Sequence, residues 1–214
     1  MSKDKLIPEP VVVRDVIDES ADVKSFLLET EDESGFHALP GQFVEVSLRG
    51  SGESTFAVSR MHQKNGLFEV SVKRSGSHTR RLHKTTSGET IGCRGPYGNH
   101  FPVEDWMGHD LLFIGGGIGL APLRPVIDRI LVERESYGKV DIVFGARSPQ
   151  DILYKKDMDQ WKADESIDLY CTIDRKADGW DGRVGFVPDL VKELAIPPGK
   201  KIAVICGPMV MIRY

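Results

Sequence analysis

The sequence predicts two domains, an N-terminal antiparallel β-barrel and a C-terminal α/β domain with a doubly wound parallel sheet. A length of 214 residues suits a pair of domains of about one hundred residues each. The first half holds short β-rich runs separated by turns, whereas apolar strands alternate with helical stretches from Asp110 onward. We place the boundary where a Gly/Pro loop gives way to a charged connection, which gives domains at residues 1–105 and 106–214.

The barrel is predicted from short runs of β-branched and aromatic residues that are bounded by glycine, proline and polar turn residues. The expected strands are residues 11–13, 42–48, 55–59, 68–72 and 90–93. The helix expected in this half follows residues 77–78, with Thr79 as its N-cap.

The second half is predicted to alternate strands with helices. Strands are expected at residues 111–114, 140–144, 168–173 and 201–206, and helices at residues 120–137, 157–163 and 188–194. This alternation is typical of parallel βαβ units. The last strand ends at Cys206, and the sequence stops within what should be the next helix. We therefore expect a domain that is truncated at its C-terminal end or completed by a partner.

The composition excludes several classes of function. Hydrophobic residues make up 40% and charged residues 28% of the chain, and the formal net charge is -4, so there is no basic footprint for nucleic acid. No segment has the apolar length of a signal peptide or a membrane span, which predicts a cytoplasmic protein without membrane insertion. Cys93, Cys171 and Cys206 contain no C-x-x-C pair, so we expect neither a zinc site nor an iron–sulfur cluster, and no other metal site, in this chain.

A turn with four glycines, Gly115, Gly116, Gly117 and Gly119, lies between a predicted strand and a predicted helix. Backbone N–H groups at such a junction can cradle a pyrophosphate. The spacing is not G-x-G-x-x-G, and Arg147 rather than an acid follows the second strand, so an ordinary Rossmann dehydrogenase is disfavoured. The alternative is a tight turn that needs glycine for close packing. We favour the ligand interpretation.

Two other segments follow predicted parallel strands, where open α/β sheets bind ligands. Arg147 could hold a ribose or its phosphate, with a solvated surface arginine as the alternative. Cys206 and Gly207 would place a small polarisable side chain and a flexible glycine beside a nicotinamide, and a buried structural cysteine fits equally well. In the barrel half, turns at residues 74–79 and 94–98 offer N–H groups and a cation for a second phosphate, or are ordinary turns.

Together these segments resemble the ferredoxin-NADP reductase superfamily, and most of all the flavoprotein subunits of sulfhydrogenases, anaerobic sulfite reductase and dihydroorotate dehydrogenase electron-transfer proteins. The resemblance covers nearly the whole chain and is carried by residues 40–43, 54–59, 76–79, 94–98, 115–122, 145–147 and 206–208. It implies an FAD-binding barrel followed by an NAD(P)-binding α/β domain, with hydride passing from the nicotinamide to the flavin.

The resemblance also implies roles for the residues at matching positions. The FAD site would comprise a strand segment, a phosphate turn and a flanking turn, namely Phe56, Ala57, Val58, Ser59, Gly76, Ser77, His78, Thr79, Gly95, Pro96, Tyr97 and Gly98. The dinucleotide site would comprise Gly116, Gly117 and Gly119 at the pyrophosphate, Arg147 and Asp151 at the ribose, and Cys206, Gly207 and Pro208 at the nicotinamide. Cys206 is the residue expected to act in catalysis.

The flavin motif departs from the family. Where the superfamily has Arg-x-Tyr-Ser, this sequence has Ser54, Phe56 and Ala57, which removes a cation near the phosphates and two hydroxyls near the ring. The missing charge would come from a basic residue beside the phosphate turn, namely Lys73, Arg74 or Arg80.

The activity that the resemblance implies is that of an enzyme, an FAD-dependent NAD(P)H oxidoreductase module. It would pass single electrons from the flavin to an iron–sulfur partner, a hydrogenase or reductase subunit of a larger complex. The related subunits carry a cysteine quartet for a [2Fe–2S] cluster, which is expected here only in a partner or a missing C-terminal segment. The alternatives are a stand-alone NAD(P)H–flavin or ferric reductase and a structural subunit that has lost FAD. Arg147 suits a ribose hydroxyl or a 2′-phosphate, so NADH and NADPH both stay open, and we favour NADH.

Overall fold

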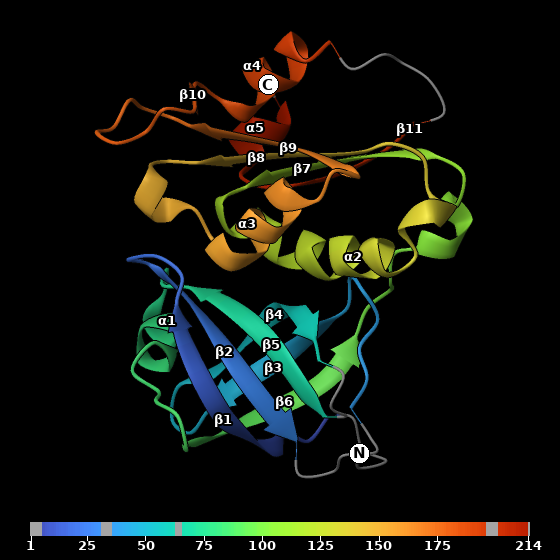
Figure 1. Ribbon diagram of the computed structural model, residues 1–214. Coiled ribbons are helices and arrows are strands. Elements are labelled where there is room, and N and C mark those ends of the chain that lie inside the picture. The colour runs from blue at the N-terminus through green and yellow to red at the C-terminus, as the bar shows by residue number, and fades with distance from the viewer. Residues whose placement is uncertain (1–5, 31–35, 63–65, 196–200, 214) are drawn as a thin grey trace. The chain divides into compact units, whose positions relative to one another are not determined.

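The structure is a computed structural model that describes residues 6–30, 36–62, 66–195 and 201–213. Its residue contacts form two compact units (Figure 1). The first unit comprises Met1–Asp18, Asp22–Phe101 and Arg124–Val126, and the second comprises Glu19–Ala21, Pro102–Leu123 and Ile127–Tyr214. The predicted fold class is confirmed, since a closed antiparallel barrel precedes a parallel α/β sheet.

The barrel is closed by six strands in the order β1-β2-β5-β4-β3-β6. They are β1 (Glu9–Asp18), β2 (Val23–Thr30), β3 (Phe43–Leu48), β4 (Gly52–Met61), β5 (Leu67–Lys73) and β6 (Thr90–Tyr97). Only β2 has no counterpart among the predicted strands, because Lys24, Ser25 and Glu29 interrupt its apolar residues.

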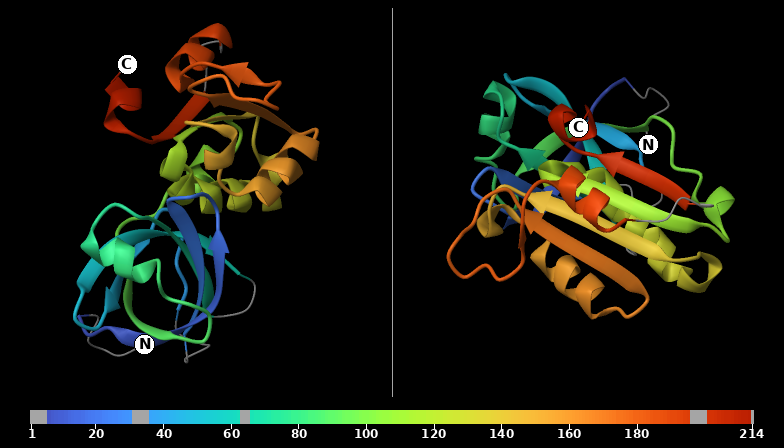
Figure 2. Two further views of the ribbon diagram at one scale, coloured as in Figure 1. Left: turned by 90° about the vertical axis from the view of Figure 1, so that its left-hand side faces the viewer. Right: turned by 90° about the horizontal axis from the view of Figure 1, so that it is seen from above.

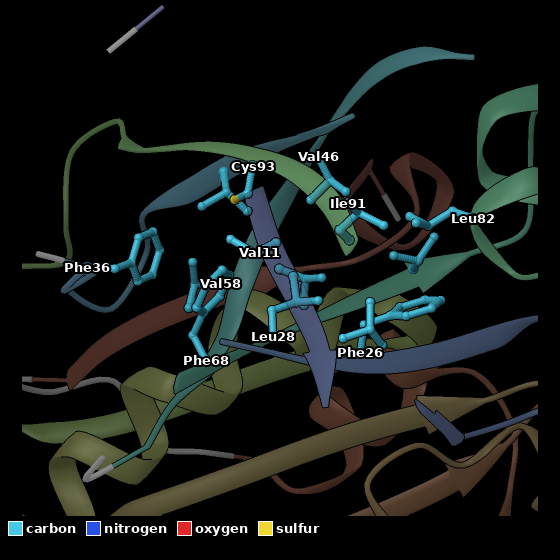
Figure 3. Packing of buried hydrophobic residues seen from close by; sticks show 14 of the residues in the cluster. Val11, Phe26, Leu28, Phe36, Val46, Val58, Phe68, Leu82, Ile91 and Cys93 are labelled. Carbon is cyan, nitrogen blue, oxygen red and sulfur yellow. The ribbon is translucent and has the colours of Figure 1, made fainter. Parts of the chain in front are cut away.

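The interior of the barrel is one hydrophobic core (Figure 3). Phe26, Leu28 and Phe68 are fully buried in it, and Leu82 of α1 (Ser77–Leu82) reaches it as well. Along each strand the side chains that point inward alternate with those that point outward, so half of each strand is committed to packing. Only the outward half is available to a ligand on the barrel wall.

The predicted short helix is present as α1, but Gly76 and not Thr79 is its N-cap. Thr79 lies inside the first turn, where its Oγ1 accepts hydrogen bonds from the backbone N–H groups of Ser75 and Gly76 at 2.9 and 2.8 Å. The predicted N-cap is therefore wrong, because the hydroxyl closes the turn from within the helix.

Glu69 on β5 is a buried carboxylate, 5% exposed, whose two partners also belong to the first unit. Its oxygens lie 2.8 Å from His62 Nε2 and 2.5 Å from Arg124 Nη1. Burial by itself would raise the pKa of Glu69, but the hydrogen bond with His62 and the charge of Arg124 lower that pKa to about 2. A depressed folded-state pKa stabilises the fold above the unfolded value, and this stabilisation is lost as the pH falls through the folded value.

We expect Glu69→Gln to flatten the acid dependence of stability. A shift from 4.5 to about 2 corresponds to about 3 kcal/mol in the free energy of unfolding. The unmodified chain should lose roughly that amount between these two pH values, beyond what the variant loses. Urea unfolding followed by circular dichroism over a pH series measures both curves. Parallel curves would contradict the role of this carboxylate.

The second unit has five parallel strands in the order β10-β9-β8-β7-β11. They are β7 (Asp110–Gly116), β8 (Val140–Ala146), β9 (Ile167–Ile173), β10 (Arg183–Val184) and β11 (Lys201–Cys206). Figures 1 and 2 show α2 (Leu120–Val132) and α3 (Lys155–Ala163) on one face and α4 (Val187–Glu193) and α5 (Met209–Arg213) on the other. Short 3₁₀ turns lie at Val103–Trp106, Gly117–Gly119, Arg134–Ser136 and Pro149–Asp151. No helix in the described ranges is long and apolar enough to span a membrane.

The helix predicted over residues 120–137 is shorter than expected and ends at Val132. Glu133 leaves the helical region with φ -121° and ψ 41°, and a 3₁₀ turn follows. The guanidinium of Arg134 donates to the carbonyl oxygens of Ser166 and Tyr137, at 2.8 and 3.1 Å. These bonds hold the tighter turn, so the prediction was wrong at this end of the helix.

The amino-terminal edge of the parallel sheet contains a buried ion-pair network. Asp141 of β8 is 1% exposed, and its two oxygens lie 2.9 Å from Lys139 Nζ and 2.8 Å from Lys201 Nζ. Lys139 also pairs with Asp168 at 2.8 Å. Because Lys201 belongs to β11, the Asp141 carboxylate ties β11 to β8 across the intervening strand β7.

Candidate functional site

The carboxyl ends of β7, β8, β9 and β11 meet at one edge of the parallel sheet. The chain runs from β7 through β8 to β9 on one side and returns as β11 on the other, so β7 and β11 flank the topological switch point. Ligands of open α/β sheets bind at this point. Cys206 pairs with Gly115, so the sheet register places residues 206–208 beside the glycine turn.

The glycines of this turn serve different purposes. A Cβ atom on Gly119 would lie 2.3 Å from the carbonyl oxygen of Cys206 and 2.8 Å from the Cα of Gly207, so the turn packs directly on the end of β11. A Cβ atom on Gly116 would lie 2.7 Å from a methionine sulfur of α5. Gly117 has φ +54° and no atom within 4 Å of its Cβ position. Close packing explains the first two glycines, whereas Gly117 leaves free space for a ligand.

The corner after β11 adds a neutral thiol to this edge. Cys206 is half-buried, and burial raises the pKa of its thiol, so the thiol keeps its proton at neutral pH. A Cβ atom on Gly207 would lie 3.2 Å from the backbone nitrogen of Gly116. The carbonyl oxygen of Pro208 accepts the N–H of Met211 at 2.9 Å, which begins α5. A flat, uncharged ring could approach this corner closely, because Cys206 and Gly207 have no bulky side chains.

The two residues predicted at the ribose contact each other after β8. Arg147 Nη2 lies 2.6 Å from Asp151 Oδ1, and Ser148 Oγ donates to the other carboxylate oxygen at 2.8 Å. Asp174 follows β9 beside them, since its N–H donates to the carbonyl oxygen of Ala146 at 3.0 Å. Burial raises the pKa of Asp174, while nearby arginines lower it. Asp174 is not among the predicted site residues, although an acid directly after a predicted parallel strand is a usable signal.

In the first unit, the segment predicted to line the flavin belongs to β4. Phe56 and Ala57 are half-buried, whereas Val58 is 3% exposed and packs in the barrel core (Figure 3). Ser59 is also buried, and its Oγ accepts a hydrogen bond from Ser71 Oγ at 3.1 Å. Phe56 also packs against the barrel core, on the same side of β4 as Val58, so of these four residues Ala57 has the surface that a ligand on the barrel wall could contact.

The predicted phosphate turn after β5 is exposed over residues 73–77, which include the cations Lys73 and Arg74. No atom lies within 4 Å of the Cβ position of Gly76. His78 is buried, with 8% of its surface exposed, and its Nδ1 lies 3.2 Å from Ser51 Oγ. Its Nε2 is buried and has no hydrogen-bond partner within the described part of the chain. A buried nitrogen without a partner is costly, and a phosphate oxygen would satisfy it.

The flanking turn, residues 95–98, is fixed by neighbours at the start of β3 and just before it. Gly98 has φ +81°, a Cβ atom there would lie 2.7 Å from the ring of Phe43, and its carbonyl oxygen accepts from Gln42 Nε2 at 2.9 Å. Gly95 is buried and Pro96 is half-buried. Phe43 pairs with Tyr97 on β6 and with Ala57 on β4. The predicted FAD segments on β4 and β6 therefore lie on either side of β3 in the barrel wall, and α1 is in contact with β4.

Both halves of the chain match known domain families. Residues 10–101 match the oxidoreductase FAD-binding domain, and residues 113–214 match the oxidoreductase NAD-binding domain. These two domains define the class of protein as a flavin- and nicotinamide-binding oxidoreductase.

Individual relatives narrow this class. The chain is 33% identical to the sulfhydrogenase 1 subunit gamma of Pyrococcus furiosus, over 81% of this chain and 60% of that protein. It is 31% identical to the probable dihydroorotate dehydrogenase B (NAD(+)) electron transfer subunit of Methanocella arvoryzae, over 96% of this chain and 70% of that protein. The solved structure of an NADH-dependent reduced ferredoxin-NADP oxidoreductase has a TM-score of 0.77 and 26% identity, covering 95% of this chain and 69% of that one.

The chain belongs to the family of FAD- and NAD-binding oxidoreductases that includes these sulfhydrogenase and dihydroorotate dehydrogenase subunits. The resemblance predicted from the sequence motifs is confirmed. The chain spans 60% of the length of the sulfhydrogenase subunit, so the activity of that whole protein does not transfer to it directly.

Proposed function

We propose that this chain is the FAD-dependent, NADH-oxidising module of a larger redox complex and that it delivers single electrons to an iron–sulfur partner subunit. The observation that carries the proposal is the meeting of the glycine turn, residues 206–208 and the Arg147–Asp151 pair at the switch point of an NAD-binding domain. The role as a subunit is supported by relatives named as a sulfhydrogenase subunit gamma and an electron transfer subunit.

The barrel wall has the residues to hold FAD, which when bound supplies the capacity to accept a hydride and release single electrons. His78 Nε2 is a buried nitrogen in need of an acceptor, and it adjoins an exposed turn with open space at Gly76. Lys73 and Arg74 flank that turn and offset the charge of a diphosphate. Ala57 presents the surface of β4 to the flavin ring, and Phe56 packs against the barrel core.

The FAD site is tested by flavin titration with a variant of its buried nitrogen. The unmodified chain should bind FAD, seen as quenching of flavin fluorescence. His78→Leu removes a hydrogen bond to a charged oxygen, worth about 1.5–3 kcal/mol, so the affinity should fall at least about tenfold. His109→Leu, at a half-buried imidazole of the second unit, is the control. Equal FAD affinity of His78→Leu and the unmodified chain would contradict the placement of the diphosphate.

In the second unit, the backbone at Gly117 would hold the dinucleotide pyrophosphate, since this glycine faces open space at the start of α2. Cys206 would lie against the nicotinamide as a neutral, polarisable neighbour. The protein's contribution is thus to bind, orient and shield the nicotinamide rather than to form covalent bonds with it.

The same edge favours NADH over NADPH. Arg147 is a cation that could meet a 2′-phosphate, and its guanidinium is paired with Asp151. Asp174 lies beside them and adds a second carboxylate. An acid at a strand end accepts hydrogen bonds from the ribose hydroxyls and repels a 2′-phosphate. Names of relatives agree, because they include an NAD(+)-dependent electron transfer subunit and an NADH-cytochrome b5 reductase.

Asp174→Asn should therefore weaken the preference for NADH. Without the carboxylate charge, the ratio of the NADPH dissociation constant to the NADH dissociation constant should fall at least about tenfold, a change of about 1.4 kcal/mol. Asp168→Asn, at the opposite end of the same strand β9, is the matched control. Both constants can be measured by nucleotide fluorescence. A ratio that Asp174→Asn leaves unchanged would sink this assignment.

A further inference from the structure

The loop that carries Arg147 and Asp151 ends in a strained residue. Tyr154 is the N-cap of α3, and its backbone is left-handed, with φ +52° and ψ +47°. A bulky residue adopts this conformation at a cost in free energy, and it keeps the conformation only where its surroundings hold it there. Tyr154 is also buried, at 3% exposed. A contact from elsewhere in the fold is therefore needed to hold this end of the loop.

Glu19 supplies this contact from a distant part of the sequence. Its Oε2 accepts a hydrogen bond from the backbone N–H of Tyr154 at 2.8 Å, although the two residues are 135 positions apart. Glu19 lies directly after β1 in the segment Glu19–Ala21, which belongs to the second unit together with α3. A hydrogen bond to a carboxylate is stronger than one between neutral groups, and a negative charge is favourable at the start of a helix. The Glu19 carboxylate thus stabilises the strained conformation of Tyr154.

A short stretch of chain connects Tyr154 to the residues predicted at the ribose. Asp151 ends the 3₁₀ turn Pro149–Asp151, and its Oδ1 lies 2.6 Å from Arg147 Nη2. Two residues separate Asp151 from Tyr154. Because so short a connection cannot absorb a change of backbone conformation, rotation of Tyr154 out of the left-handed region would move Asp151 relative to Arg147.

This connection gives Glu19 a part in nucleotide binding. Resting on the proposed function, we propose that Glu19 is a positioning residue for NADH. Through the backbone of Tyr154, it holds the loop of residues 147–153 in the conformation in which Arg147 and Asp151 meet the ribose. Glu19 acts at the far end of this loop and needs no contact with the nucleotide.

Fluorescence titration of the full chain with NADH tests this inference. Glu19→Leu leaves the N–H of Tyr154 without this acceptor, so the dissociation constant for NADH should rise at least about tenfold. Glu19→Gln keeps an accepting oxygen at the same reach, so its dissociation constant should stay within about threefold of that of the unmodified chain. Glu19→Asp keeps the charge but is one methylene shorter, so it should also weaken NADH binding. Tryptophan fluorescence in urea shows which variants fold, and Glu19→Asp decides the test if Glu19→Leu does not.

Two further variants separate positioning from a general loosening of the fold. Asp18→Leu removes a neighbouring carboxylate whose side chain is 74% exposed, and it should change the dissociation constant for NADH by less than about twofold. Asp151→Ala removes the contact that Glu19 is proposed to position. Residues that act through one structure are not additive, so the double variant of Glu19→Leu and Asp151→Ala should bind NADH about as weakly as Asp151→Ala alone.

Other outcomes would overturn the inference. Equal weakening of NADH binding by Glu19→Leu and Glu19→Gln, or normal binding by Glu19→Asp, would show that the charge matters and the hydrogen bond does not. Additive effects in the double variant would show that Glu19 does not act through the loop. An unmodified chain that binds no NADH would contradict the proposed function itself, and the inference with it, whereas NADH binding that Glu19→Leu leaves unchanged contradicts the inference alone.

Discussion

Gly119→Ala is expected to open the carboxyl edge of the parallel sheet and to remove dinucleotide binding. The added Cβ would lie 2.3 Å from the carbonyl oxygen of Cys206 and 2.6 Å from its carbonyl carbon, and neither main-chain atom can rotate away. Relief requires the start of α2 to separate from the end of β11. Overpacking typically costs about 1–3 kcal/mol and occasionally more. Because both sides are backbone here, we expect at least about 3 kcal/mol.

In the full chain, tryptophan fluorescence reports on the second unit, because all three tryptophans belong to it, namely Trp106, Trp161 and Trp180. Tryptophan fluorescence in urea gives its unfolding midpoint, and NADH titration gives binding. Gly117→Ala is the matched control, with a strain of about 1–2 kcal/mol for its left-handed backbone. It should keep most of the stability but weaken NADH binding, because the methyl group enters the free space. A Gly119→Ala variant with normal midpoint and NADH affinity would contradict the close packing.

Asp141→Ala is expected to destabilise the second unit by about 3–5 kcal/mol, as removal of one partner from a buried ion pair does. The substitution leaves the ammonium of Lys201, whose side chain is 12% exposed, without the carboxylate that lies 2.8 Å away. Lys201 begins β11, the strand that carries Cys206 to the switch point. Loss of the pair at the start of β11 should therefore also loosen the position of Cys206 at the end of the same strand.

The matched control for this variant is Asp168→Ala, which removes another carboxylate paired with Lys139. The Asp168 side chain is 50% exposed, so its loss should cost less than about 1 kcal/mol. Urea unfolding followed by tryptophan fluorescence compares the two variants. Similar midpoints for Asp141→Ala and Asp168→Ala would show that burial adds nothing to the Asp141 network.

The sequence predicts those parts of the fold where one local pattern dominates. The strands β7, β8 and β11 are largely apolar runs that end in glycine, alanine and cysteine, and their carboxyl ends lie within two residues of the predicted ends. By contrast, β2 mixes polar and apolar residues, and it becomes a strand because β1 and β5 pair with it on both sides. Such pairing depends on residues distant in sequence.

The site residues likewise divide into those that a local motif predicts and those that only the fold brings together. The glycine turn is a local motif, so its position between strand and helix is predictable. Asp174 joins Arg147 only through the parallel register of β8 and β9, and His78 meets Ser51 only because α1 lies on the β3–β4 hairpin. Neither contact is encoded in a short stretch of sequence. The role of Gly119 is likewise set by the backbone of β11, and not by a bound phosphate.

The most direct test of the central claim is anaerobic addition of NADH to the full chain after reconstitution with FAD. Our account predicts a flavin absorption spectrum on reconstitution, followed by bleaching with one equivalent of NADH, which NADPH produces only at much higher concentration. A chain that takes up no FAD under any reconstitution condition, or one that keeps its flavin oxidised in excess NADH, would contradict it.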